Sequence, residues 1–86
     1  MNVEIVTPEE DLWKGEARSV VVPSLEGDLG ILPGRQPVLA VLRPGTVRIT
    51  ADGGAQQTFD VVAGFVSADD DRVEIVVDNT PETIAE

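Results

Sequence analysis

Carboxylates are almost the only residues of this sequence that could do chemistry, because the chain contains neither cysteine nor histidine. Without a thiol there is no thiolate nucleophile and no disulfide. Without an imidazole, the commonest metal ligand and the commonest general base at neutral pH are missing, and no serine can be activated by histidine. Catalysis would therefore have to rest on paired carboxylates.

Three groups of neighbouring acids could in principle bind a cation or act as an acid–base pair. They are Glu9-Glu10-Asp11, Glu26 with Asp28, and Asp69-Asp70-Asp71. A calcium site needs about six to eight oxygens, usually from alternate residues, and three adjacent aspartates at a hairpin tip cannot all face one ion. A catalytic pair also needs a pocket, which a domain this small seldom has beyond its core. The sequence therefore predicts no metal, no cofactor and no catalytic residue.

The acidic balance of the chain excludes several kinds of partner. The chain has 16 Asp and Glu against 6 Lys and Arg, which gives a formal net charge of −10. Such a surface repels nucleic-acid phosphates and anionic lipid headgroups, and no apolar run approaches the ~20 residues of a membrane helix. We therefore expect no nucleic-acid partner and no direct membrane insertion. The charge serves either solubility or the binding of a basic protein.

The elements that must position these residues are short β-strands, because apolar residues recur with period two. No segment shows a helical apolar period over three turns. The run PVLAVLR is apolar on both faces, as is typical of a strand covered on both sides. We predict an all-β fold, a two-sheet β-sandwich or flattened barrel of about eight to ten short strands, forming a single domain over residues 1–86. The strand-like runs are NVEIV, SVVVP, PVLAVLR, TVRIT, TFDVVA and RVEIVVD.

Glycine and proline mark the turns between these strands. Leu32-Pro33-Gly34-Arg35 and Arg43-Pro44-Gly45-Thr46 both suit a type II turn, with proline fixing the first central φ and glycine taking a positive φ at the second. Asp52-Gly53-Gly54 predicts a hairpin. Gly64, inside a strand-like run, predicts a bulge or a close approach of another backbone.

The segment EGDLGILPGRQPVLAVLRPGTVRI, with the segments on either side of it, resembles the epsilon subunit of bacterial F-type ATP synthases. That family has an acidic glycine-rich corner, a Pro-Gly turn, a strand, a second Pro-Gly turn and another strand in this order. The aromatic-spacer-glycine unit Trp13-Lys14-Gly15 and the hairpin FDVVAGFVSADDDRVEIVVD agree with it. The family commonly has histidine where Arg35 stands here. The resemblance covers nearly the whole chain and implies the family's N-terminal β-sandwich domain.

The resemblance implies a non-catalytic rotor subunit of the central stalk, which binds the gamma subunit and the c-ring and couples rotation to ATP synthesis. Such a subunit is peripheral, at the cytoplasmic face of the bacterial cell membrane, as part of a proton-translocating complex. The family's two-helix C-terminal domain is expected to be absent, in a chain that is either naturally short or truncated, so no ATP site is expected. By matching position, the c-ring contact falls on Glu26, Gly27, Asp28, Arg35 and Gln36. The gamma contact is placed on Thr7, Val38, Ala40 and Leu42.

Two other classes compete with a stalk subunit. A free-standing β-sandwich module that binds a ligand or a carbohydrate usually displays aromatic platforms, and the chain has one tryptophan, two phenylalanines and no tyrosine. A small enzyme is disfavoured by the missing histidine and cysteine. A concave, polar pocket of ligand size would favour either alternative.

Overall fold

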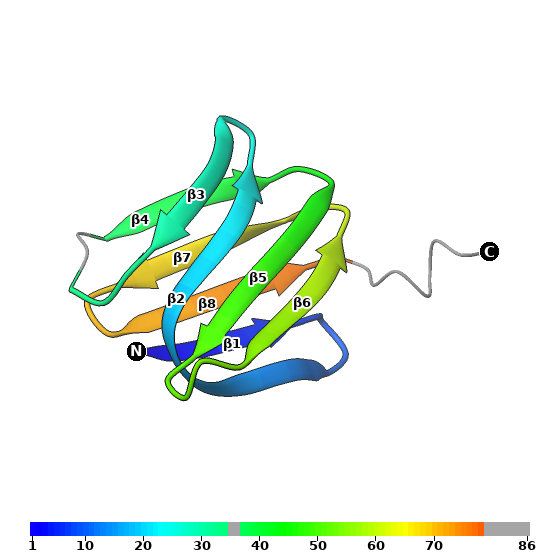
Figure 1. Cartoon of the computed structure of the whole chain (residues 1–86). Coiled ribbons are helices and arrows are strands. Elements are labelled where there is room, and N and C mark those ends of the chain that lie inside the picture. The colour runs from blue at the N-terminus through cyan, green and yellow to red at the C-terminus, as the bar shows by residue number, and fades with distance from the viewer. Residues whose placement is uncertain (35–36, 79–86) are drawn as a thin grey trace.

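The structure, a computed structural model, describes residues 1–34 and 37–78, which form eight β-strands and no helix (Figure 1). The predicted all-β fold is confirmed. Arg35 and Gln36 lie outside the described residues. The strands are β1 (Asn2–Val6), β2 (Asp11–Ser24), β3 (Gly27–Ile31), β4 (Val38–Leu42), β5 (Gly45–Ala51), β6 (Gln56–Val61), β7 (Gly64–Asp69) and β8 (Arg72–Val77).

The strands make two packed layers that share β2. In Figure 1 the front sheet, β3, β2, β5 and β6, lies over the back sheet, β4, β7, β8 and β1. The first half of β2 pairs with β1 of the back sheet, and its second half pairs with β3 and β5 of the front sheet. An irregularity between Ala17 and Ser19 separates the halves. A bulge bends its strand, which lets β2 pass from one layer to the other and gives a flattened barrel.

The core lies between the layers and is built from β-branched residues. Alternate residues of each strand point inward, so the predicted period-two pattern is confirmed in β1, β5 and β8. Each fully buried valine or isoleucine contributes roughly 1.5–3 kcal/mol to folding. The largest fully buried side chains are Val3, Ile5, Val20, Val22, Ile31, Val47, Ile49, Val66, Ile75 and Val77.

Two glycines are required by close packing of backbone or ring atoms. Gly64 has φ +147°, and a Cβ there would overlap the carbonyl oxygen of Val76 and lie 2.9 Å from Cα of Val77. The predicted close backbone approach is confirmed. Gly45 does not have a positive φ, so the type II turn predicted at residues 43–46 is wrong. Gly45 begins β5, and a Cβ there would lie 2.8 Å from Cβ of Pro23.

Candidate protein-binding surfaces

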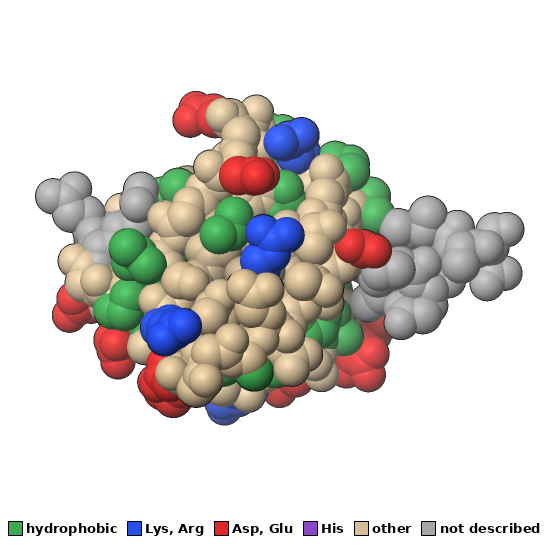
Figure 2. All heavy atoms as spheres, in the orientation of Figure 1, with side chains coloured by type: hydrophobic (Ala, Val, Ile, Leu, Met, Phe, Trp, Pro, Cys, Tyr) green, Lys and Arg blue, Asp and Glu red, His purple; other side chains and the backbone are tan. Residues whose placement is uncertain are grey.

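The first candidate surface is the tip between β2 and β3, where Glu26 stands beside exposed Leu25. Gly27 follows with φ +119°, a conformation that suits only glycine. The Ser24 hydroxyl donates to the carbonyl of Gly27 at 2.6 Å and accepts from the amide of Glu26 at 3.2 Å. The tip is therefore a closed turn, and acidic side chains lie beside a basic one where it projects at the top of the molecule (Figure 2).

The structure describes the first three of the five predicted c-ring residues. Glu26, Gly27 and Asp28 lie at the start of β3, whereas the Pro33–Gly34 turn follows its other end. The five residues of β3 separate them by roughly 13–17 Å. Gly34 has φ +80°, as the type II prediction requires, and its amide donates to the carbonyl of Asp70 at 3.2 Å. The corner therefore has two exposed ends along one strand, and Arg35 and Gln36 follow the second end outside the described residues.

The second candidate surface is a row of apolar side chains across the outer face of the back sheet. Val41 of β4 stands opposite Phe65 of β7, Phe65 opposite Val76 of β8, and Val76 beside Val6 of β1. Val41 is 55% exposed and Phe65 42% exposed, and the other two are half-buried. We call Val6, Val41, Phe65 and Val76 the apolar row. A contiguous apolar patch on a sheet face is typical of a protein interface.

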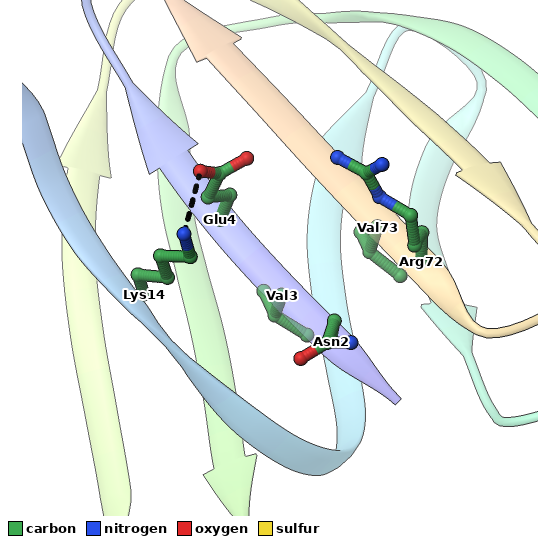
Figure 3. Close-up of a pocket in the computed structure, with 6 residues that line it drawn as sticks. All are labelled: Asn2, Val3, Glu4, Lys14, Arg72 and Val73. Carbon is green, nitrogen blue, oxygen red and sulfur yellow. Dashed lines mark ion pairs between the residues drawn. The ribbon is translucent and has the colours of Figure 1, made fainter.

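Carboxylates border the apolar row on the same face of the back sheet. The next register line runs from Leu39 through Ser67 and Glu74 to Glu4. Glu4 forms an ion pair with Lys14 of β2, with Oε2 and Nζ 3.8 Å apart (Figure 3). The face thus combines an apolar centre with a mainly acidic margin. A partner that fits it would carry apolar side chains flanked by basic ones.

The residues of β4 that face outward differ from those predicted to contact gamma. Val38 and Ala40 are half-buried against the core, and Leu42 is 3% exposed within it. The outward face of the strand consists of Leu39 and Val41, so the side chain of Leu42, predicted to contact gamma, does not reach the surface. This is a correction to the choice of face, because the strand itself does have an uncovered apolar side.

Thr7, the remaining residue of the predicted gamma contact, directly follows Val6 of the apolar row. Its hydroxyl donates to the carbonyl of Glu10 at 3.2 Å and accepts from the amides of Glu9 and Glu10 at 3.2 and 3.1 Å. Thr7 therefore stabilises the β1–β2 turn at one end of the row. The sequence did not single out Phe65, Val76 or Leu25. The available signal was that Phe65 is out of phase with the buried Val66 and Ala68.

The described residues form several depressions on the surface of the sandwich. One, of about 290 Å³, is lined by Asn2, Glu4, Lys14 and Arg72 with two valines (Figure 3). Another, of about 400 Å³, lies between the β2–β3 tip and β4. Neither is lined by an aromatic side chain. Within residues 1–34 and 37–78, no three acidic side chains converge as metal ligands, and no helix could cross a membrane.

Comparison with known proteins identifies the family to which this chain belongs. Residues 1–82 match the family described as the ATP synthase delta/epsilon chain, beta-sandwich domain. The ATP synthase epsilon chain of Micrococcus luteus is 44% identical over 75 residues, which cover 87% of this chain and 82% of the relative. ATP synthase epsilon chain 2 of Ralstonia nicotianae is 51% identical over 65 residues, which cover 76% of this chain and 47% of the relative. The epsilon chain of Neisseria meningitidis is 38% identical over 79 residues, 91% of this chain and 56% of the relative.

Solved structures give the same fold at lower identity. A chain in the mitochondrial ATP synthase of Euglena gracilis, solved as OSCP, F1 and c-ring, superposes with a TM-score of 0.84 at 23% identity, over 90% of this chain and 49% of that one. A chain in the central stalk and c-ring of the Tetrahymena thermophila mitochondrial enzyme gives 0.75 at 24% identity, over 92% of this chain and 63% of that one. This chain spans about half the length of the Ralstonia and Neisseria relatives. From the match over residues 1–82 and the shared sandwich, the chain belongs to the family of ATP synthase delta and epsilon chains, as the β-sandwich domain.

Proposed function

We propose that this chain is a non-catalytic central-stalk subunit of an F-type, proton-translocating ATP synthase. It binds the gamma subunit and the c-ring at the cytoplasmic face of the bacterial cell membrane, and it couples ring rotation to ATP synthesis. The observation that carries this proposal is the family match over residues 1–82, together with relatives named as ATP synthase epsilon chains. The chain contributes attachment and stiffness, and catalysis takes place in other subunits.

The gamma subunit binds the apolar row of the back sheet. Phe65 and Val41 supply the exposed apolar area at the centre of the contact, and Leu39 extends it along β4. Thr7 lies at the other end of the row and holds the β1–β2 turn beside it. The carboxylates of Glu4 and Glu74 border the contact and select a partner with basic groups at its margin, because rim charges govern specificity more than affinity.

The c-ring binds two sites, the acidic β2–β3 tip at the start of β3 and the Pro33–Gly34 turn that follows its end. The Glu26 and Asp28 carboxylates can accept hydrogen bonds from basic or amide groups of the ring's polar loops, and such charge-assisted bonds are stronger than free surface ion pairs. The Pro33–Gly34 turn, followed by Arg35 and Gln36, forms the second end of this contact. The ring loops then extend along β3 between the two ends.

The experiment that tests the proposal is a calorimetric titration of the purified chain with its cognate gamma subunit at moderate salt. We expect saturable one-to-one binding with a negative heat-capacity change, because an apolar surface is buried. Raising the salt concentration should weaken the affinity only moderately, since the charges lie at the margin. Absence of binding between two demonstrably folded proteins would contradict the assignment of gamma to this sandwich.

Replacing Gly34 by valine should weaken c-ring docking more than it weakens folding. The positive φ of Gly34 strains any β-branched residue, but no heavy atom lies within 4 Å of the new Cβ, so the damage stays in the turn. We expect the free energy of unfolding to fall by about 1–3 kcal/mol. The affinity for the c-ring should fall by about tenfold or more. Chemical denaturation and binding to the purified ring measure the two effects.

The matched control is Gly54→Val, which places the same side chain at φ +98° in the β5–β6 hairpin. It should cost similar stability and leave c-ring docking unchanged. Equal loss of docking in both variants would mean that Gly34 acts through global stability and that its turn is no part of the contact.

A further inference from the structure

The β2–β3 tip projects beyond both sheets, yet its base is hydrogen-bonded to the end of β4 and to the residue that follows β4 (Figure 1). The amide of Leu25 donates to the carbonyl of Val41 at 3.0 Å, and the amide of Arg43 donates to the carbonyl of Pro23 at 2.9 Å. Ser24 stands opposite Leu42 in register between these bonds. The end of β4, together with Arg43, therefore pairs with the base of the tip as a third strand beside β2.

The side chain of Arg43 adds a contact that its backbone cannot supply. Its Nε donates to the carbonyl of Ser24 at 2.9 Å, in a part-buried position. Its Nη2 lies 3.9 Å from Oδ1 of Asp28, but the two side chains are 48% and 71% exposed, so this ion pair adds little. The bond to the Ser24 carbonyl is short, charge-assisted and part-buried, and it is the contact that matters for the tip.

Ser24 connects this contact to the end of the hairpin. It is 7% exposed, and it is the polar residue that the described core buries. Its hydroxyl bonds both the carbonyl of Gly27 and the amide of Glu26. Restraining the Ser24 backbone from the Arg43 side therefore also restrains the turn, which would otherwise be free to hinge at Gly27, where φ is +119°.

We propose that Arg43 is a positioning residue, which locks the β2–β3 tip to the β4–β5 corner and so presents Glu26 to the c-ring in a fixed orientation. This inference rests on the proposed function, since it assigns the tip to the ring. An ordered tip binds without the entropy loss of fixing a mobile hairpin. It also transmits sideways force into both layers, because Arg43 directly follows β4 of the back sheet and precedes β5 of the front sheet.

The first test is hydrogen–deuterium exchange of the isolated chain, followed residue by residue by NMR. In Arg43→Met, which keeps the length of the stem and the backbone bond to Pro23, the amides of Leu25 and Glu26 should exchange about tenfold faster. The amide of Ile49 in the core should be unchanged. Arg43→Lys should lie between the two, and Arg48→Met, at an exposed arginine on β5, should leave the tip as it is.

Asp28→Asn separates the two contacts of the guanidinium. It should leave exchange at the tip unchanged, because the ion pair is exposed. Unchanged exchange at Leu25 and Glu26 in Arg43→Met would overturn the proposal. Asp28→Asn loosening the tip as much as Arg43→Met would overturn it too, since the ion pair would then be the working contact.

The second test is docking of the complex between this chain and gamma to the purified c-ring in detergent. Arg43→Met should lower ring affinity about tenfold and leave gamma affinity unchanged, a split that general destabilisation would not produce. Faster exchange at the tip with unaltered ring affinity would overturn the positioning role. Failure of the unsubstituted complex to bind the ring would instead refute the ring contact of the proposed function. The exchange data would still test whether Arg43 restrains the β2–β3 tip.

Discussion

Alanine at Gly64 is expected to destabilise the fold strongly, with the largest effect of any single added methyl group in this chain. Its Cβ would overlap the Val76 carbonyl oxygen in the neighbouring β8, at a backbone φ of +147° that L-residues rarely adopt. Overpacking and backbone strain together should cost about 3–5 kcal/mol, against a total stability of about 5–15 kcal/mol for most small domains. Urea denaturation followed by tryptophan fluorescence measures the loss, with Trp13 as the probe.

The control for Gly64→Ala is Gly30→Ala in β3. No heavy atom lies within 4 Å of that Cβ, and Gly30 has no positive φ. Alanine in an open strand position should be neutral or stabilising by up to about 1 kcal/mol. A similar loss at both positions would show that glycine is needed in these strands for some reason other than the approach of β8.

Aspartate at Phe65 should reduce affinity for gamma by about 100-fold or more and leave the sandwich folded. The side chain is 42% exposed on the outer face, so its replacement opens no core cavity. In the complex, however, a carboxylate would be buried among Val41 and Val76 without a partner, which is costly. Calorimetric titration gives the affinity, and the melting temperature should fall by only a few degrees, about what a loss of 1 kcal/mol produces.

Thr58→Asp is the matched control for Phe65→Asp, because it adds the same charge to an exposed position of β6 on the front sheet. It should leave gamma affinity within about twofold. Val41→Asp, one strand away on the apolar row, should repeat the loss seen at Phe65. If the front-sheet variant weakened gamma binding as much as the back-sheet variants, the interface would not lie on the apolar row.

The alternation of residues predicted the fold because most strands of this chain have one apolar face. In β8, the buried residues Val73, Ile75 and Val77 alternate with charged residues that face solvent, namely Arg72, Glu74 and Asp78. Gly64 was also predictable, because a glycine inside a strand pattern indicates a close approach. These inferences depend only on neighbours in sequence.

The choice of face in β4 was not predictable, because the strand is apolar on both sides. A shift of one residue in register exchanges the two faces, so only the pairing of Ala40 with Val66 decides that Leu39 and Val41 face outward. The type II turn predicted around Gly45 was wrong for a related reason. The Pro-Gly pair suggested a local turn, but the glycine is required by Pro23, a residue of another strand.

The extent of β2 was likewise hidden, because its 14 residues serve two sheets in turn. The sequence shows a β-branched run that reaches Pro23, and an aromatic-spacer-glycine unit before it. In the structure both belong to one strand, and a Cβ at Gly15 would lie 3.0 Å from the ring of Trp13. The spacing reflects an indole lying over a glycine, which no pattern of hydrophobicity reveals.

The parallel pairing of β1 with β8 has a consequence for how the chain acquires its structure. It joins Asn2 to Arg72 and Val6 to Val76, residues far apart in sequence. Because such contacts are distant in sequence, the folding time should lie in the range of about milliseconds to seconds, as for other β-barrels. While a ribosome is still making β8, β1 can pair only with β2 and β7 only with β4, so both strands present open edges. The sandwich therefore closes in one late step, and the nascent chain depends on protection from aggregation until Val77 has emerged.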